Sequence, residues 1–214
     1  MERRKISATR LQPRKVKVLF LGCGFLASHI VPTILPYCSQ ITLVDHDRVE
    51  QENYENTIYL KGQTRKFKVR ALANTIQILS SIPVNPLHKF IEKLTDIPSG
   101  SDFAFVTFDN IKARKITVKL DIPAIGIGVT ENYAIIEWAD QYPLPTTEEE
   151  IDKVEREMLT IRDVCSRLEF RSLGSLAAAY ASHVFRIWLE TSKKQSYQIS
   201  IQTGVIKTHG VERE

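Results

Sequence analysis

Apolar residues fall into short runs along the first two thirds of the chain. The runs at 15–22 and 40–45 are rich in branched apolar side chains and predict strands buried on both faces. The second of these runs ends on an acidic residue, Asp45. Further runs predict a weaker strand at 84–91 and strands at 102–108, 123–129 and 133–138. We expect the last of these to turn back antiparallel to its neighbour.

Helices are predicted between these strands. Within 64–82 the apolar residues recur at a spacing near 3.6, at Val69, Leu72, Ala73, Ile76 and Leu79, and Pro83 ends the pattern. Residues 25–38 read as a second helix, which Pro32 is expected to kink or shorten. Residues 46–63 are polar and irregular. A third helix is predicted at 110–120.

The last third of the chain departs from this alternation. Residues 143–159 predict a loop followed by a solvent-facing helix, and 172–190 predict a strongly apolar helix rich in small residues, which belongs either to the core or to an interface. Residues 196–209 predict a hairpin that turns at Thr203 and Gly204.

Repeated alternation of strand and helix is typical of a doubly wound sheet. We therefore expect an α/β fold with a Rossmann-like, mainly parallel sheet and antiparallel strands toward the C-terminus. The length of 214 residues suits one domain over 1–214. Within it we expect a basic N-terminal arm at 1–14, a loop and helical insert at 139–170, and the apolar helix plus hairpin at 171–214.

Charge is modest overall but uneven. The net charge of +4 is too small to demand a nucleic-acid partner. Seven basic residues against one acid lie within 1–18, which predicts either a solvated arm or an arm that binds a polyanion.

The three cysteines form no CxxC pair, which argues against a zinc cage. Their odd number and the lack of a signal peptide predict a reducing, cytoplasmic location. No apolar run approaches 18 residues, so no membrane span is expected.

The first strand runs into a glycine-containing turn, Gly22-Cys23-Gly24-Phe25-Leu26-Ala27-Ser28. Gly22 permits a tight turn, Gly24 lets backbone amides approach a phosphate, and the following helix N-terminus adds partial positive charge. The alternative is a plain strand-to-helix turn that needs glycine. Asp45 lies 21 residues past Gly24, where a carboxylate can accept both ribose hydroxyls. Together these features indicate a nucleotide site, for either NAD or ATP.

The segment LVDHDRVEQENYEN resembles the ThiF/MoeB/HesA family, bacterial relatives of ubiquitin-activating enzymes. Asp45, Asp47, Val49, Glu50 and Asn53 fall in step with the family pattern D-x-D-x-V-E-x-S-N. FKVRALA is similar to the family segment that carries a lysine, here Lys68, and FVTFDN is similar to D-A-T-D-N, with Asp109 as the acid. SLGSLAAAYAS resembles the small-residue helix of the family. The likeness covers 16–138 well and 170–190 loosely.

The resemblance implies an ATP- and Mg²⁺-dependent adenylation of a carboxylate, often the C-terminus of a ubiquitin-like protein, with release of pyrophosphate. It makes residues 22–28 the phosphate cradle, including Gly22, Gly24, Ala27 and Ser28, and adds Asp47 to the nucleotide site. By the same resemblance Asp45 holds the ribose, Asn53 contacts the phosphates, and Lys68 neutralises charge at the transferring phosphate. Asp109 holds magnesium or orients the incoming carboxylate. The residue types also allow Lys68 to be one more exposed cation and Asp109 to cap the next helix.

Two positions are of particular interest. Asn56 stands where the family has an arginine; Arg48, Arg65 and Lys66 are local candidates for the missing cation, and Arg10 or Arg14 could act from a partner subunit. Cys165 lies close to a family cysteine that takes up the activated acyl group, and Arg162 and Arg167 beside it favour a thiolate. An ordinary half-buried thiol is the alternative.

Several functions are therefore compatible with the sequence. The first is adenylation of a small ubiquitin-like or peptide carboxylate by a homodimer or heterodimer. The second is a weakened nucleotide-binding scaffold subunit, which Asn56 favours. An NAD-dependent oxidoreductase would leave DHDRVEQEN unexplained, and a nucleic-acid-binding role has no base-reading motif.

Overall fold

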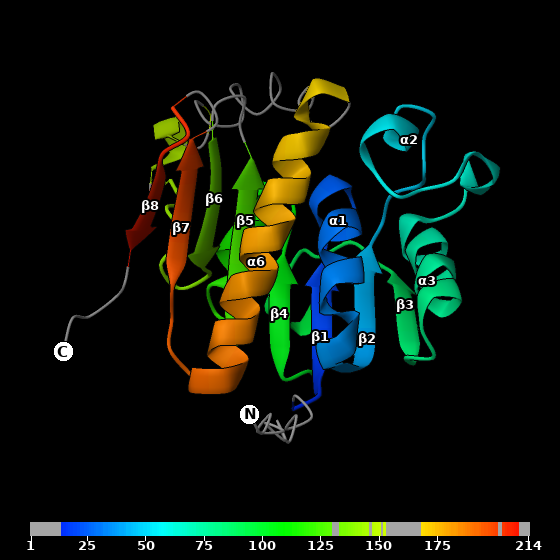
Figure 1. Cartoon of the computed structure of the whole chain (residues 1–214), viewed down its shortest axis with the longest axis horizontal. Coiled ribbons are helices and arrows are strands. Elements are labelled where there is room, and N and C mark those ends of the chain that lie inside the picture. The colour runs from blue at the N-terminus through cyan, green and yellow to red at the C-terminus, as the bar shows by residue number, and fades with distance from the viewer. Residues whose placement is uncertain are drawn as a thin grey trace, which may run out of the picture.

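The computed structural model describes residues 14–129, 133–145, 147–150, 152, 168–200 and 203–209. Within these residues eight strands form one sheet in the order β3-β2-β1-β4-β5-β6-β7-β8 (Figure 1). The strands are β1 (Val16–Leu21), β2 (Cys38–Asp45), β3 (Val84–His88), β4 (Phe103–Val106), β5 (Ala124–Val129), β6 (Tyr133–Trp138), β7 (Ser196–Ser200) and β8 (Ile206–His209).

The sheet has a parallel half and an antiparallel half. Strands β3, β2, β1, β4 and β5 pair in parallel, whereas β5 to β8 pair antiparallel in sequence. This arrangement confirms the predicted Rossmann-like fold with antiparallel strands toward the C-terminus. The carboxyl ends of the parallel strands all lie at one edge of the sheet, where such folds bind ligands.

Helices cover both faces of the sheet. They are α1 (Phe25–Ile34), α2 (Asn53–Asn56), α3 (Lys68–Leu79), α4 (Ile111–Thr117) and α6 (Arg171–Thr191), with 3₁₀ turns η1 (Leu35–Tyr37), η2 (Lys61–Gln63), η3 (Leu94–Asp96) and η4 (Leu168–Phe170). Figure 1 shows α1 and α6 side by side on one face, with α3 near the β3 edge and α2 beyond the carboxyl edge.

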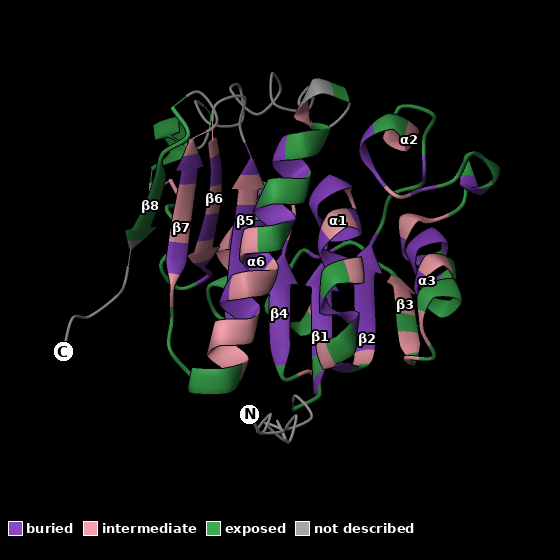
Figure 2. Ribbon diagram, viewed as in Figure 1, coloured by how far each residue is buried: buried purple, intermediate pink, exposed green. Residues whose placement is uncertain are grey.

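Alternate residues of the central strands fill two separate cores. Val18 and Phe20 of β1 pack with α1, α3 and α6, whereas Leu19 and Leu21 pack on the α4 side. Figure 2 shows the central strands buried along most of their length. Burial on both faces explains why these strands read as nearly continuous apolar runs.

The helix predicted at 64–82 is shorter in the structure. Arg65 has a left-handed backbone with φ of 66°, and Phe67 is extended and bridges to Arg48, so α3 begins only at Lys68. Helix α1 runs through Pro32 but ends at Ile34, and β2 begins at Cys38. Most of the helix expected within 143–159 lies outside the described residues.

Helix α6 belongs to the core. Its small residues let it approach α1 closely: a Cβ added at Gly174 would overlap the Phe25 ring, and Ala177, Ala178 and Ala181 are buried. In the part of the chain that the structure describes, no helix is long and apolar enough to cross a membrane.

Candidate nucleotide-binding and active site

The glycine turn lies at the carboxyl end of β1, pressed against the end of β4. Gly22 has φ of +98°, and a Cβ there would lie 2.8 Å from Oγ1 of Thr107. The Thr107 hydroxyl donates to the Gly22 carbonyl at 2.9 Å, which fixes the turn to the neighbouring strand. Both the backbone conformation and the close approach therefore require glycine at this position.

Gly24 precedes α1 and leaves its N-terminus open. No side chain caps the helix, and a Cβ at Gly24 would meet nothing within 4 Å. The first amide groups of α1 therefore have room for an anion. Ala27 and Ser28 are buried in the first turn, and the Ser28 hydroxyl donates back to the Phe25 carbonyl at 2.7 Å. These two residues shape the turn and do not place a polar side chain in it.

Asp45 ends β2 and fastens the glycine turn from the other side. Its Oδ2 accepts the Cys23 amide at 2.6 Å, and its Oδ1 accepts the Asp47 amide at 2.7 Å. Burial raises the pKa of this carboxyl group, although Lys68 and the two amides oppose the shift. Asp45 thus lies beside the cradle, as a ribose ligand must, and it also holds the cradle in shape.

Lys68 is the first residue of α3 and points back toward Asp45 and Asp47. Its Nζ lies 2.9 Å from Oδ2 of Asp47, and its side chain is only 15% exposed. Burial lowers the pKa of Lys68, but the surrounding carboxylates outweigh burial and raise the pKa overall; they belong to Asp45, Asp47 and Asp109. A lysine at a helix N-terminus opposes the helix dipole, so only these acids make its position favourable. The alternative of a freely exposed cation is wrong.

Asp109 follows β4 and is exposed at the same edge of the sheet. It lies close enough to Lys68 to raise the pKa of that ammonium group. The alternative role of Asp109 as a helix cap is wrong, because α4 is capped by Asn110, whose Oδ1 accepts the Ala113 amide at 3.2 Å. The Asp109 carboxylate is not used in that way.

Asn53 begins α2 above the carboxyl edge. Its Oδ1 accepts the Glu50 amide at 3.0 Å, which orients the side chain, while its Nδ2 makes no hydrogen bond with the described residues. Asn56, three residues later, is fully buried, and its carbonyl bonds to the His29 ring at 2.7 Å. The position of the expected family arginine therefore carries no charge and faces inward.

The sequence predicts a magnesium site at Asp109. Within the described ranges, the one group of acidic or metal-ligating side chains close enough to share an ion is Asp45, His46 and Asp47, and Asp109 is not part of it. Within that group Asp45 already accepts two backbone amides, and Asp47 already pairs with Lys68. Magnesium commonly takes one or two carboxylates together with substrate phosphates, so a single exposed carboxylate is compatible with the role predicted for Asp109, which stays a prediction.

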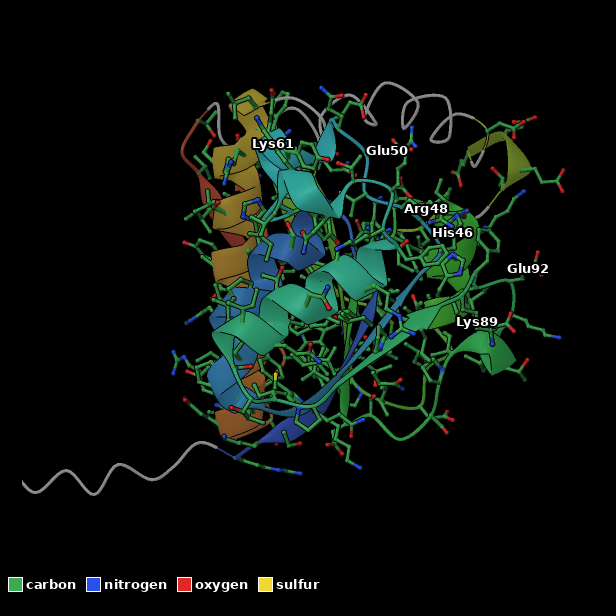
Figure 3. The ribbon with its side chains drawn as sticks, turned by 90° about the vertical axis from the view of Figure 1, so that its right-hand side faces the viewer. His46, Arg48, Glu50, Lys61, Lys89 and Glu92 are labelled. Carbon is green, nitrogen blue, oxygen red and sulfur yellow. The ribbon has the colours of Figure 1, made fainter. Side chains whose placement is uncertain are left out.

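Arg48, one of the local candidates for the missing cation, makes contacts outside the glycine turn. Its guanidinium lies 3.9 Å from the centre of the Phe67 ring and donates to the Arg65 carbonyl at 2.7 Å. The other face of Phe67 packs on His88, with ring centres 3.6 Å apart. Figure 3 labels Arg48 near His46 at this edge of the molecule.

Other predicted residues lie away from the site or outside the described residues. Arg14 precedes β1 and so lies at the opposite edge of its own sheet. Cys165 and Arg10 fall outside the described residues, and the acyl-carrying role of Cys165 stays a prediction.

Two residues at the site had no signal in the sequence. Tyr59 lies in the segment read as irregular, yet its hydroxyl is buried and donates to the Cys23 carbonyl inside the glycine turn. Arg114 of α4 donates to the Phe108 carbonyl at 2.7 Å and to the Ile127 carbonyl at 2.6 Å, and so fixes the segment that carries Asp109. Only the fold brings these side chains to their partners.

Residues 6–134 match the ThiF family. The chain belongs to the ThiF family. This match includes the glycine turn, Asp45, Lys68 and Asp109, and it confirms the resemblance drawn from the sequence. A search of curated proteins gives no match.

Solved structures show the same fold for this ThiF-family protein. Escherichia coli MccB with ATP superposes with a TM-score of 0.73 at 18% identity, over 95% of this chain and 66% of MccB. MccB with AMPCPP and MccA gives 0.69 at 19% identity, over 93% of this chain and 64% of MccB. PaaA gives 0.67 at 16% identity, over 91% of this chain and 72% of PaaA. The chain thus spans slightly less than two thirds of the length of MccB.

Proposed function

We propose that this protein adenylates a carboxylate with ATP and releases pyrophosphate. The observation that carries the proposal is the convergence of Lys68, Asp45, Asp47 and Asp109 beside the open N-terminus of α1. A nucleotide site needs an anion cradle, and an ammonium group beside the cradle can neutralise charge that develops on a transferring phosphate. Membership of the ThiF family and the crystal structures of MccB with ATP support the same interpretation.

The proposed reaction assigns a role to each of these groups. The substrate carboxylate attacks the α-phosphorus, a new carboxyl oxygen–phosphorus bond forms, and the bond to the pyrophosphate oxygen breaks. The amides at the start of α1 and the Lys68 ammonium stabilise the negative charge on the phosphate oxygens as the bonds change. Asp45 orients the ribose and Asn53 offers its amide nitrogen to the phosphates. Asp109 would hold magnesium, which when bound would neutralise phosphate charge.

For the substrate we propose the C-terminal carboxylate of a peptide or of a small ubiquitin-like protein. MccB has been crystallised with MccA and with N-formylated MccA, which favours a peptide end over a free metabolite. We further propose that the protein acts as a homodimer or as half of a heterodimer.

A specific observation keeps the scaffold function as a second candidate. Asn56 is buried and uncharged at the place of the family arginine, so the described residues of α2 bring no cation to the phosphates. A protein of this kind would bind nucleotide and leave catalysis to a related subunit.

The deciding experiment is ATP–pyrophosphate exchange in the presence of candidate peptides and ubiquitin-like proteins. We expect exchange that depends on the carboxylate and falls at least about 100-fold in Lys68→Ala, since removing one charge-stabilising group typically lowers the rate by that factor. Lys119→Ala is the matched control, because Lys119 is exposed beyond the end of α4. Equal exchange in wild type and Lys68→Ala would refute the assignment. Binding of ATP without exchange would favour the scaffold, and calorimetric binding of NAD alone would favour an oxidoreductase.

A further inference from the structure

The cradle lacks positive charge for a triphosphate. Lys68 is shared with Asp47 at 2.9 Å, and ATP would bring several further negative charges to the start of α1. Given the proposed function, we propose that Arg171, at the start of α6, binds the β- and γ-phosphates of the nucleotide. Arg171 lies in none of the sequence motifs described above, and no sequence feature distinguishes it from the other arginines of the chain.

The packing of α6 on α1 places Arg171 at the right end of the molecule. Gly174, one turn further along α6, lies against the ring of Phe25, and Phe25 directly follows the cradle glycine Gly24. Arg171 therefore lies beyond the first turn of α1, on the side of the carboxyl edge. In Figure 1 the start of α6 and α2 both rise past this edge, with α1 between them.

The Arg171 side chain extends from α6 to α2. Its Nη1 donates to the carbonyl of Glu55 in α2 at 2.7 Å, two residues after Asn53. Burial lowers the pKa of His29 in α1, and the positive charge of Arg171 lowers it further, in agreement with a guanidinium close to α1. The charge thus lies where α1, α2 and α6 meet, on the side of the carboxyl edge.

Arg171 is also available for a ligand. The side chain is exposed, uses one of the five guanidinium N–H groups, and makes no ion pair with any described carboxylate. Two other arginines at the carboxyl edge are occupied: Arg48 stacks on Phe67, and Arg114 is buried and bonded to two carbonyls. A guanidinium can bond phosphate oxygens with two parallel N–H groups, which a lone lysine cannot do.

The test is calorimetric titration of the full chain with MgATP and, separately, with AMP. We expect Arg171→Gln to weaken MgATP binding about 10- to 100-fold, the range for losing hydrogen bonds to a charged group, and to leave AMP binding unchanged. Arg171→Lys should recover part of the loss. The matched control is Arg186→Gln on the same helix, whose side chain pairs with Glu190 at 2.9 Å away from the cradle. It should bind both nucleotides like wild type.

Each outcome separates the inference from the proposed function. Unchanged MgATP affinity in Arg171→Gln, with normal binding by wild type, overturns the inference alone. Equal losses of MgATP and AMP binding also overturn it, because they show that Arg171 acts through α2 or through folding; thermal melting of each variant distinguishes these two causes. Failure of the wild-type protein to bind MgATP overturns the proposed function and the inference with it.

Discussion

The parallel half of the sheet buries polar side chains, whereas its antiparallel half keeps them at the surface. Asp45, Asn56, Gln63 and Arg114 are all at least nine-tenths buried around β1, β2 and β4. Among the described residues of β6 to β8, only Ser196 is a buried polar residue. The charges there form exposed pairs instead, such as Lys194 with Asp140 at 2.7 Å.

The difference has a physical meaning. Burying a polar or charged group costs free energy unless each of its hydrogen-bonding atoms finds a partner. Asp45 and Arg114 are bonded to backbone groups of the loops at the carboxyl edge and of β5, and therefore hold this edge in one conformation; Nη1 of Arg114 has no partner among the described residues. The antiparallel strands extend the core without such groups. The comparison indicates that the parallel half is shaped for a ligand, and it can be tested by matched changes in the two halves.

The largest effect is expected for Asp45→Ala. This change leaves the Cys23 and Asp47 amides without their acceptor, and we expect a loss of about 2–3 kcal/mol in the free energy of unfolding, together with weaker ATP binding. The matched change in the antiparallel half is Asp140→Ala, which breaks an exposed pair and should cost less than about 1 kcal/mol. Urea unfolding of both variants measures the difference. Similar losses in the two variants would remove the contrast between the halves.

Gly174→Ala tests the contact between α6 and the cradle. The added methyl group would overlap the Phe25 ring, and we expect a destabilisation of about 1–3 kcal/mol from overpacking. Because Phe25 opens α1, ATP affinity should fall as well. Gly62→Ala is the control: its new Cβ would meet nothing within 4 Å, so the melting temperature should stay close to that of wild type. A stable Gly174→Ala with normal ATP binding would show that α6 does not support the cradle.

Tyr59→Phe removes one buried hydroxyl and keeps the ring. Loss of the hydrogen bond to the Cys23 carbonyl should lower stability by about 0.5–1.5 kcal/mol and weaken ATP binding. Tyr197→Phe is its counterpart in the antiparallel half, where the hydroxyl donates to the Gln195 side chain at 3.0 Å. We expect calorimetry to show an affinity change only for Tyr59→Phe. A change in stability without a change in affinity would make Tyr59 a packing residue.

The smallest effect is a pH dependence from His29. Burial and the nearby Arg171 lower the pKa of this imidazole from 6.5, so the unfolded chain binds a proton more readily than the folded one. Its contribution to stability is therefore complete above about pH 6.5 and is lost as the pH falls through the pKa of the folded state. Because the ring is partly exposed and solvent screens its charge, we expect a loss below about 1 kcal/mol. Urea midpoints between about pH 7.5 and 5 measure this slope. It should be smaller in His29→Gln, and an unchanged slope would rule His29 out as its source.

The residue pattern alone determined the alternation of strands and helices, because strands buried on both faces leave continuous apolar runs. It also located the glycine turn, Asp45, Lys68 and Asp109, since each lies at the end of a predicted element or in a recognisable motif. The pattern misplaces the start of α3, because the left-handed Arg65 and the bridge from Phe67 to Arg48 depend on contacts across a loop.

Only the tertiary structure decided which other side chains contact the carboxyl edge of the sheet. Tyr59 and Arg171 are distant in sequence from the carbonyl groups that they bond, and Arg114 bonds a carbonyl of the next strand, β5; no local periodicity marks these residues. It also decided that Lys68 is paired with Asp47 and partly buried. The reason is physical: a sequence pattern records which face of an element is apolar, whereas a hydrogen bond between distant segments exists only after the chain has folded.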